Sequence, residues 1–276
     1  MGHPIGHTKS PIFQQAGLDE LGIDETFEAW DVLPEDLEAK IATFRESGFI
    51  ASCVTLPYKQ DVIPLVDELT EAAEAIGAVN WIFNRDGKLV GHNTDGSGFL
   101  RALKEKAGFD PKGADAVVFG AGGAARAIIY ALKTAGVNRL TIANRTVEKA
   151  QVLANDFTAG RFKPTATSIS RDELTNYVPY ANLLVNTTSL GMVGGPAELA
   201  TPATADMISA DTVGYDVVYA PPITKFLREV EEAGGKPAGG MTMLVFQGIE
   251  GFEISTGHTA PVDTMFSAIE KALKSD

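Results

Sequence analysis

A glycine-rich stretch, GAGGAAR (120–126), follows the apolar run ADAVVF and precedes the helix-like AIIYALKTAG. Gly120 permits a tight turn, Gly122 lets the backbone approach a pyrophosphate, and Gly123 keeps the start of the helix small. The free N–H groups and the dipole of that helix would then face the phosphates. Glycines also build ordinary turns, but here a strand and a helix flank them as a nucleotide loop requires. The stretch therefore predicts a dinucleotide-binding loop, formed by Gly120, Ala121, Gly122, Gly123 and Ala124.

The next strand-like run, RLTIA, ends in Asn144, Arg145 and Thr146. A site for NAD usually has an Asp or Glu here, which binds the ribose 2′-hydroxyl. A guanidinium instead suits a 2′-phosphate, and the adjacent hydroxyl adds a hydrogen bond. The residues favour NADP over NAD. In the alternative interpretation, Asn144 or Thr146 only caps the following helix and Arg145 is solvated.

A redox cofactor requires a substrate and a group that handles a proton. Reactive residues occur on three predicted loops, HTKSP (7–11), VTLPYK (54–59) and GHNTDGSG (91–98). Each loop follows a strand or precedes a helix, and ligands gather at the carboxyl ends of strands in α/β sheets. We therefore expect the substrate to bind at these loops.

The elements that must position these loops alternate between strand and helix signals. In the first part of the chain we predict strands at 26–32 and 49–55, helices at 34–47 and 67–77, and a hairpin over 78–93. Residues 98–114 are expected to form a helix followed by a break that contains proline and glycine. A second series of strands and helices then begins with AVVF, which indicates a doubly wound sheet. Two helices, 242–256 and 262–275, end the chain without a strand between them.

The predicted fold class is α/β with two α/β domains. The substrate or catalytic domain comprises 1–97 plus 242–276, so that the C-terminal helices return to it. A Rossmann-type, doubly wound NADP domain comprises 98–241. We expect hinges near 96–100 and 238–242.

Composition excludes several classes of protein. The 276 residues are 45% apolar, which supports a sizeable core, and no apolar run reaches the length of a membrane helix. A net charge of −13 argues against nucleic acid or an anionic membrane as a partner. One cysteine, Cys53, and the lack of a signal-like start favour a cytoplasmic protein.

The motifs GHPIGHTKSP, VTLPYK, GAVN, GHNTD, GAGGAAR, NRT and MLVFQ occur in this order. As a set, and over essentially the whole chain, they resemble the shikimate dehydrogenase family. The resemblance implies NADP-dependent, reversible reduction of 3-dehydroshikimate to shikimate, or a related reaction on quinate. It also implies a place in aromatic amino acid biosynthesis, on the chorismate pathway, and an active site in the cleft of a two-domain protein.

By this resemblance, Lys59 is the acid/base that handles the hydroxyl proton, and Asp95 is its partner carboxylate. The alternative for Lys59 is a surface lysine, and for Asp95 a helix N-cap. The resemblance further implies a substrate site and two more cofactor contacts. The substrate residues would be Thr8, Ser10, Thr55, Asn80, Tyr219 and Gln247, and the cofactor contacts Thr187 and Gly240. Ser10 as an N-cap before Pro11, and Tyr219 as core packing, are the competing interpretations.

Four features depart from the family's pattern. Cys53 stands where the family usually has an asparagine, Trp81 where it has a threonine, and Thr8 where it has the first serine of a Ser-x-Ser pair. An indole at Trp81 would reshape the substrate site unless it turns into the core. The sequence also begins at the first loop, so either a strand precedes the given start or this domain has one strand fewer.

These departures leave alternatives open. The substrate could be quinate or another shikimate-like compound, and a ligand sensor that has lost turnover is a competing class. We expect a cyclic hydroxy acid as partner, no nucleic acid or membrane, and a monomer or homodimer. His3, His7 and His92 match no metal-ligand spacing, so we expect them to form loop hydrogen bonds, with no bound metal.

Overall fold

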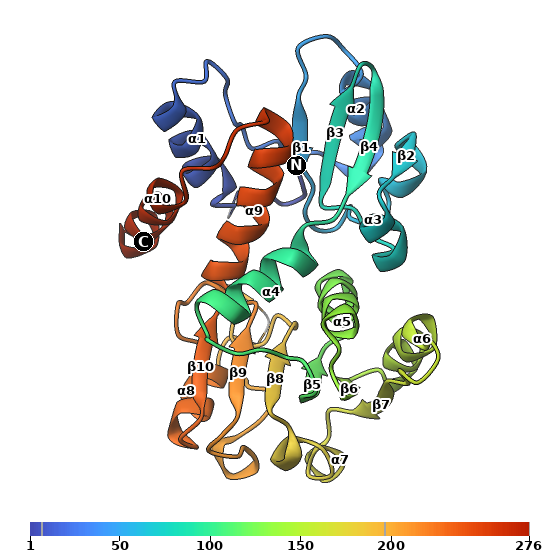
Figure 1. Cartoon of the computed structure of the whole chain (residues 1–276), viewed down its shortest axis with the longest axis vertical. Helices are drawn as coiled ribbons and strands as arrows, with labels where there is room; N and C mark the ends of the chain where they lie inside the picture. The colour runs from blue at the N-terminus through green and yellow to red at the C-terminus, as the bar shows by residue number, and fades with distance from the viewer. Residues whose placement is uncertain (7, 196, 276) are drawn as a thin grey trace. The chain divides into compact units, whose positions relative to one another are not determined.

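The computed structural model describes residues 1–6, 8–195 and 197–275. The chain forms two compact units. Unit 1 comprises Met1–Gly98 and Val245–Asp276, and unit 2 comprises Phe99–Leu244. The chain leaves unit 1 within helix α4 (Asp95–Glu105) and re-enters it within helix α9 (Met241–Thr256), as Figure 1 shows.

Unit 1 carries a four-stranded mixed sheet with the order β1-β3-β4-β2. Strands β3 and β4 form the expected hairpin, in which Asp86 and Gly87 both have positive φ, as a two-residue type I′ turn requires. Besides parts of α4 and α9, the elements of unit 1 are α1 (Ser10–Leu21), α2 (Leu37–Thr43), β1 (Ala51–Cys53), β2 (Glu68–Leu69), α3 (Glu71–Ile76), β3 (Trp81–Arg85), β4 (Lys88–His92) and α10 (Val262–Ser275).

Several predicted elements of unit 1 are shorter than expected. The strand predicted at 49–55 is β1, of three residues, and the first part of the helix predicted at 67–77 is instead β2, because Thr70 caps α3 and the helix begins only after it. Residues 34–47 form a 3-10 turn at Pro34–Asp36 and then the seven-residue α2, rather than one helix. The strand predicted at 26–32 is wrong as a strand, because this segment forms only one isolated bridge, between Gly2 and Asp31. A strand needs a paired neighbour along its length, and here the pairing stops after two residues.

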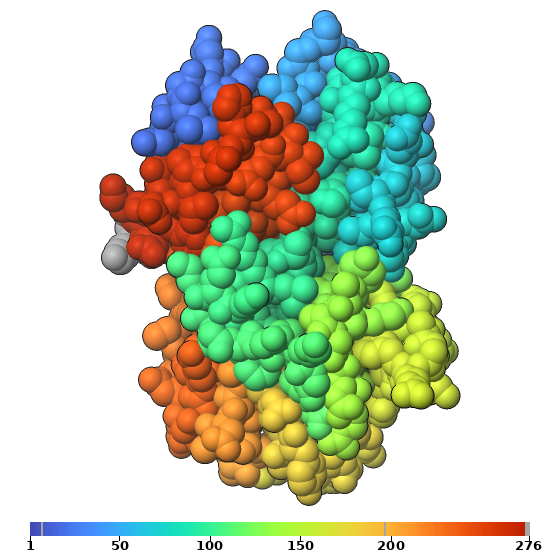
Figure 2. All heavy atoms as spheres, in the orientation of Figure 1, coloured from blue at the N-terminus to red at the C-terminus, as the bar shows by residue number. Residues whose placement is uncertain are grey.

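The C-terminal helices belong to unit 1. Helix α10 packs against α1, and Gln14 Nε2 of α1 donates to Gly248 O of α9 at 2.8 Å. A side chain at Gly248 would collide with Phe13, so α1 and α9 approach each other closely. The space-filling view shows the C-terminal segment against the N-terminal one (Figure 2).

Unit 2 contains a fully parallel sheet of six strands in the order β10-β9-β8-β5-β6-β7. This is the doubly wound order: the chain first adds β6 and β7 on one side of β5, and then adds β8, β9 and β10 on the other side. The α/β fold class is thereby confirmed. The elements are β5 (Asp115–Phe119), α5 (Gly123–Ala135), β6 (Arg139–Asn144), α6 (Val147–Phe157), β7 (Thr165–Ser168), α7 (Arg171–Leu174), β8 (Leu183–Asn186), β9 (Val213–Asp216), α8 (Lys225–Glu232) and β10 (Lys236–Gly239).

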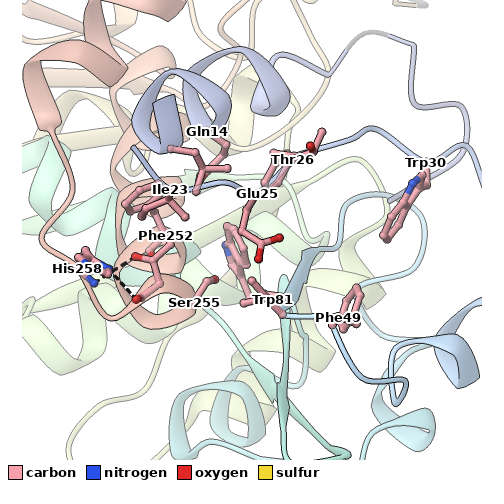
Figure 3. Close-up of a pocket in the computed structure, with 16 residues that line it drawn as sticks. Gln14, Ile23, Glu25, Thr26, Trp30, Phe49, Trp81, Phe252, Ser255 and His258 are labelled. Atoms are coloured by element: carbon pink, nitrogen blue, oxygen red, sulfur yellow. Dashed lines mark hydrogen bonds between the residues drawn. The ribbon is translucent and has the colours of Figure 1, made fainter. Parts of the chain in front are cut away.

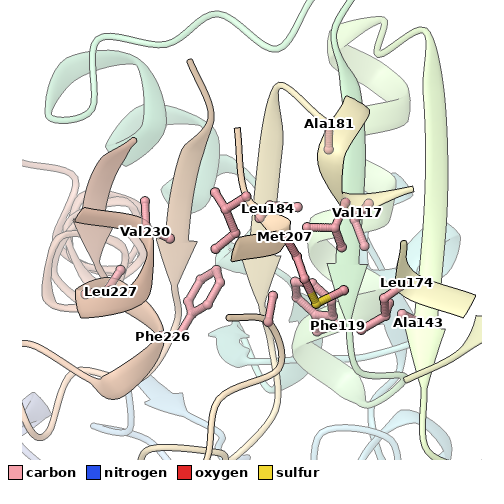
Figure 4. Close-up of a cluster of buried hydrophobic side chains, with 13 residues drawn as sticks. Val117, Phe119, Ala143, Leu174, Ala181, Leu184, Met207, Phe226, Leu227 and Val230 are labelled. Carbon is pink, nitrogen blue, oxygen red and sulfur yellow. The ribbon is translucent and has the colours of Figure 1, made fainter. Parts of the chain in front are cut away.

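Buried side chains from the central strands of this sheet pack against α8. Phe119 of β5 meets Phe226 of α8 edge to face, with ring centroids 6.1 Å apart, and Leu184 and Val230 complete the contact (Figure 4). Burial on both faces of a parallel sheet explains the near-continuous apolar runs of β5 and β8. No helix among the described residues is both long and apolar enough to cross a bilayer.

Candidate active site

The structure brings Lys59 and Asp95 together in unit 1. Lys59 Nζ lies 2.5 Å from Asp95 Oδ2, and the two side chains are 16% and 7% exposed. Lys59 follows β1, and its carbonyl accepts a hydrogen bond from Val79 N at 2.7 Å. Asp95 is the first residue of α4. The ammonium group is therefore held by a carboxylate at a mostly buried position, which a surface lysine would not be.

Asp95 does not use its carboxylate to cap α4. Its second oxygen, Oδ1, accepts a hydrogen bond from Asn80 Nδ2 at 2.9 Å. The neighbouring Asn93 serves the start of the helix, because its Oδ1 accepts from Asp95 N at 3.0 Å. Both carboxylate oxygens thus bond to side chains from separate segments of the chain, Lys59 after β1 and Asn80 directly before β3.

Asn80 is the centre of a buried polar network. Its Nδ2 also lies within hydrogen-bond distance of Thr94 Oγ1 (3.0 Å) and Gln247 Oε1 (3.3 Å), and its Oδ1 accepts from Thr94 N at 2.8 Å. Asn80 is 1% exposed. Because buried polar groups cost free energy unless they are bonded, this network fixes the rotamers of Asn80 and Asp95. Thr94 and Asn93 were not among the predicted site residues, although both belong to the quoted GHNTD motif.

Gln247 reaches this network from α9. A Cβ at Gly98 of α4 would lie 2.6 Å from Gln247 N of α9. The backbones of the two helices are therefore in close contact next to this network. The predicted grouping of Lys59, Asp95, Asn80 and Gln247 is thus present as a connected set of hydrogen bonds. Their roles toward a ligand remain predictions.

Trp81 lies in the core rather than in front of this network. It is 1% exposed, stacks on Phe83 with centroids 5.8 Å apart, and packs over Gly251 of α9 so closely that a Cβ there would collide with the indole. Its Nε1 lies 3.3 Å from Gln247 Oε1. The indole therefore supports Gln247 from behind, where a threonine could not reach as far.

The remaining predicted substrate residues of unit 1 are Thr8 and Thr55, outside the helices and strands, and Ser10, the first residue of α1. Thr55 is half-buried and its N–H donates to Met1 O at 3.0 Å. Thr8 Oγ1 accepts weakly from Ser10 N, at 3.4 Å. Ser10 is buried and lies inside the first turn of α1, whose N-cap is Lys9, so the interpretation of Ser10 as the N-cap is wrong by one residue. Thr8 and Ser10 remain predicted ligands of a substrate carboxylate.

Tyr219 remains a predicted substrate contact, and Cys53 departs from the asparagine that is usual in the family. Tyr219 follows β9 in unit 2, whereas the other predicted substrate residues belong to unit 1. Cys53 is half-buried at the end of β1, and burial raises the pKa of its thiol. A protonated thiol cannot replace the two-way hydrogen bonding of an asparagine amide.

The predicted histidine hydrogen bonds are seen for two of the three residues. His3 Nδ1 lies 2.8 Å from Asp31 Oδ1, and His92 Nδ1 lies 2.7 Å from Thr70 Oγ1. His7 lies outside the described residues. In the described part of the chain, no three His, Cys, Asp or Glu side chains form a group that could hold a metal ion.

In unit 2 the glycine loop follows β5 at the point where the strand order reverses. Gly120 has φ of 111°, and a Cβ there would lie 2.5 Å from Thr187 Oγ1. Gly122 is the N-cap of α5, offers no side chain to the first turn, and has no heavy atom within 4 Å of where its Cβ would stand. An open cradle at the N-terminus of a 13-residue helix fits a pyrophosphate, which needs bare N–H groups and close backbone approach.

Arg145 remains a predicted ligand of the 2′-phosphate. It is exposed directly after β6, and no carboxylate of the described residues forms an ion pair with it. Asn144 Nδ2 donates to Thr146 O at 2.8 Å, and the Thr146 side chain makes no capping bond to α6. Thr146 thus occupies the N-cap position of α6 without a side-chain capping bond, and the exposure of Arg145 agrees with both interpretations of this triplet.

Thr187 and Gly240 have structural roles in unit 2. Thr187 Oγ1 donates to Phe119 O at 2.7 Å, which ties the end of β8 to the glycine loop. Gly240 packs against the Val217 carbonyl so closely that any side chain would collide. Their contacts with a cofactor remain predictions.

A buried carboxylate near these loops was not predicted. Asp216, at the end of β9, is fully buried and bonds to Asn186 Nδ2 (3.0 Å), Thr224 Oγ1 (2.6 Å) and Val218 N (3.0 Å). Burial raises its pKa to about 6. Asp216 therefore fastens the end of β8, the loop after β9 and the start of α8 to one another. The sequence feature that could have indicated this buried carboxylate is an acidic residue at the end of an apolar strand.

Comparisons with known proteins agree with these features. The family model of the shikimate dehydrogenase substrate binding domain matches residues 1–82, and that of shikimate/quinate 5-dehydrogenase matches residues 102–192. The NADP(+) shikimate dehydrogenase of Methanopyrus kandleri is 43% identical over 99% of this chain and 94% of its own length. That of Moorella thermoacetica is also 43% identical, over 99% of this chain and 92% of its own length.

Solved structures extend the likeness to the fold. Shikimate 5-dehydrogenase of Thermus thermophilus, in complex with NADP(H) and shikimate, is 34% identical with a TM-score of 0.86, over 98% of this chain and 97% of that one. Quinate dehydrogenase of Corynebacterium glutamicum, with NAD, is 30% identical with a TM-score of 0.90, over 98% and 96%. A 5-ketofructose reductase of Gluconobacter is 34% identical with a TM-score of 0.86, over 98% and 96%. The chain therefore belongs to the shikimate dehydrogenase family of oxidoreductases.

Proposed function

We propose that this chain catalyses the reversible, NADP-dependent reduction of 3-dehydroshikimate to shikimate. The observation that carries the proposal is the 2.5 Å contact of Lys59 Nζ with Asp95 Oδ2, inside the network centred on Asn80. Relatives named as NADP(+) shikimate dehydrogenases over nearly the whole chain support the choice of substrate and cofactor. The reaction would place the chain in aromatic amino acid biosynthesis.

Lys59 would handle the proton in this reaction. NADPH, when held by the glycine loop and Arg145, would supply the hydride for the ketone carbon, whose oxygen then needs a proton. Lys59 then gives a proton to this oxygen, and in the reverse direction it takes the proton from the hydroxyl. Asp95 holds the ammonium in place through one oxygen, and Asn80 holds Asp95 through the other.

The other predicted residues would bind the two ligands. Thr8 and Ser10 would bind the substrate carboxylate, while Thr55, Asn80, Gln247 and Tyr219 would contact ring hydroxyls. The glycine loop would bind the pyrophosphate, with Thr187 and Gly240 toward the nicotinamide. Arg145 and Thr146 would bind the 2′-phosphate, because a guanidinium forms paired, charge-assisted hydrogen bonds with phosphate oxygens.

Quinate remains a second candidate substrate, since the quinate dehydrogenase has the same fold at 30% identity. Cys53 also supports quinate as a candidate, because a thiol in place of the asparagine amide changes which ring substituents can be hydrogen-bonded. The 5-ketofructose reductase adds a keto sugar to the compounds worth testing.

A spectrophotometric screen at 340 nm tests the proposal. Purified protein is mixed with NADP+ or NAD+ and with shikimate, quinate or the alcohol product of 5-ketofructose reduction. We expect fastest reduction with shikimate and NADP+. A higher kcat/KM for quinate than for shikimate would mean that quinate is the substrate. No reduction of either cofactor with any compound would favour the ligand sensor.

A further inference from the structure

Side chains from four parts of unit 1 meet beside the Asn80 network. His92, at the end of β4, has its Nδ1 2.7 Å from Thr70 Oγ1 and its Nε2 3.4 Å from Glu250 Oε1. The other carboxylate oxygen of Glu250 contacts the hydroxyl of Ser97 in α4. Thr70 is the N-cap of α3 and Glu250 belongs to α9, so these contacts join α3, β4, α9 and α4. None of the roles proposed above uses them.

The donors and acceptors around His92 fit one another. Thr70 Oγ1 accepts a hydrogen bond from Ala73 N at 3.3 Å, and its own hydrogen is available to His92 Nδ1. A neutral imidazole whose Nδ1 accepts a hydrogen bond carries its proton on Nε2, which then donates to Glu250. The His92 side chain is only 15% exposed, so water competes little for this bond. The contact with Glu250 is therefore directional, unlike an ion pair on an open surface.

Both ends of the contact between His92 and Glu250 lead back to Asn80. The backbone carbonyl of His92 accepts a hydrogen bond from Asn80 N at 3.0 Å. Glu250 lies one helical turn after Gln247 in α9, and residues at this spacing share one face of a helix. Gln247 Oε1 in turn lies 3.3 Å from Asn80 Nδ2 and 3.3 Å from Trp81 Nε1. The contacts thus close a ring that joins the open end of the β3–β4 hairpin to α9.

The Gln247 amide depends on the placement of its helix. Its carbonyl oxygen has three side-chain donors near it, but each lies 3.3–3.4 Å away. Hydrogen bonds of this length are weaker than those near the usual 2.9 Å or so, and they constrain a side chain less. A contact that fixes the rotation of α9 therefore also fixes Gln247. Glu250 supplies such a contact, because it is held from β4 on one side and from α4 on the other.

We propose that His92 and Glu250 are positioning residues for Gln247, and that they act through the rotation of α9. The inference rests on the proposed function in one respect, because it takes Gln247 as a ligand of a substrate hydroxyl. Loss of either residue leaves the contacts of Asp95 with Lys59 and Asn80 in place. Substrate binding therefore weakens while proton transfer continues, and the signature of this pair is an altered KM at a nearly constant kcat.

The test uses the full chain and matched variants. Glu250→Ala removes both contacts of this side chain, whereas Glu250→Gln keeps an oxygen and an amide group in their places. His92→Phe keeps a ring beside Phe83, whose centroid lies 6.1 Å from that of His92, but it has no ring nitrogens. Glu253→Ala is the control on the same helix, because Glu253 accepts a hydrogen bond from Ala260 N, outside the ring of contacts.

The indole N–H of Trp81 reports the position of Gln247 without any substrate. Both tryptophans of the chain, Trp30 and Trp81, line a groove of about 390 Å³ (Figure 3), so total tryptophan emission does not separate them. Their N–H groups do differ, since that of Trp30 donates to Glu28 Oε2 and that of Trp81 to Gln247 Oε1. Solvent exchange of the indole N–H, measured by NMR and assigned with Trp30→Phe, therefore follows the Trp81–Gln247 bond.

We expect exchange of the Trp81 indole N–H to become at least about tenfold faster in Glu250→Ala and in His92→Phe, with the backbone amides of β3 exchanging at the parental rate. In both variants KM for shikimate should rise roughly 3–10-fold, the effect of one hydrogen bond, while kcat stays within about twofold. Glu250→Gln and Glu253→Ala should resemble the parent in both measurements. The double variant should be no worse than either single one, because both substitutions open the same ring.

Parental indole exchange in folded Glu250→Ala, or in His92→Phe if that protein alone folds, would overturn the proposal. So would a loss of about tenfold in kcat at unchanged KM, because the pair would then act on Lys59 rather than on Gln247. Indole exchange requires no substrate, so it decides on this inference even if the parent does not reduce NADP+ with shikimate.

Discussion

Asn80 Nδ2 lies 2.9 Å from Asp95 Oδ1, whereas Lys59 Nζ contacts the other carboxylate oxygen, Oδ2. The amide thus holds the carboxylate that holds the ammonium. Asn80 lies directly before β3 and Asp95 is the first residue of α4, so the chemistry depends on how the hairpin meets that helix. Each prediction below tests one such relationship.

Asn80→Ala should lower both stability and turnover. The substitution leaves Thr94 N–H and one Asp95 oxygen without their partner, which should cost about 2–4 kcal/mol in the free energy of unfolding. Asn84→Ala is the matched control, because Asn84 lies in β3, which follows Asn80 directly, but bonds to the hairpin turn and to Phe44 O. Urea unfolding and steady-state kinetics should show lower stability in both variants but lower kcat only in Asn80→Ala. Unchanged kcat in Asn80→Ala would argue against the positioning of Asp95 by this amide.

Two glycines of the loop should behave differently. Gly122→Ala adds a methyl group to open space at an allowed backbone conformation, so stability should change by less than about 0.5 kcal/mol. The methyl group would occupy the cradle, so Kd for NADP+ should rise at least about tenfold. Gly120→Ala should instead cost roughly 1–3 kcal/mol of stability, because φ is 111° and Thr187 Oγ1 is too close. Titration calorimetry and urea unfolding measure the two effects, and normal NADP+ affinity in Gly122→Ala would exclude the cradle.

Arg145→Ala should weaken NADP+ and spare NAD+. Loss of a charge-assisted contact of about 1.5–3 kcal/mol corresponds to an increase of roughly 10–100-fold in Kd for NADP+. Arg139→Ala is the control, since Arg139 lies at the opposite end of β6 and pairs with Asp115. Kd values for both cofactors, measured by fluorescence titration, should separate the two arginines. Equal losses for NAD+ and NADP+ in Arg145→Ala would be incompatible with a 2′-phosphate contact.

Asp216 should make the stability of unit 2 depend on pH. Its folded pKa of about 6 lies above the ordinary value of 3.8, so the folded state retains a proton that the unfolded state has lost. The contribution of Asp216 is therefore most favourable below about pH 4 and is lost as pH rises through 6, by on the order of 3 kcal/mol. Asp216→Asn should remove this dependence and gain stability relative to the parent between pH 4 and 7. Urea unfolding across this range checks it, and a constant difference between the two proteins would show that Asp216 does not titrate there.

The local signals were sufficient where an element's own residues determine it. The hairpin was predictable because Asp86 and Gly87 suit a tight turn, and β5 and β8 because buried parallel strands are apolar on both faces. The glycine loop, with its flanking strand and helix, was predictable for the same reason.

Other features depend on partners that are distant in the sequence. Strand β10, Lys236–Gly239, was not predicted, because it contains proline and glycine, which are uncommon in strands. The structure tolerates them because β10 pairs with β9 alone and is therefore an edge strand. Residues 26–32 have a strand-like pattern, but pattern alone does not supply the neighbour that a strand requires. The contacts of Asn80 with Gln247, 167 positions away, could be expected only from the resemblance to a family.

The central claim is that Lys59 handles the hydroxyl proton of a shikimate-type substrate. Its most direct test is the rate of shikimate-dependent NADP+ reduction by Lys59→Ala, with Lys88→Ala as control, since Lys88 pairs with Glu68 on the surface of the same unit. We predict that Lys59→Ala loses roughly 10²–10⁴-fold in kcat while shikimate affinity changes only a few-fold, and that Lys88→Ala matches the parent. A correctly folded Lys59→Ala protein with near-normal kcat would contradict the account.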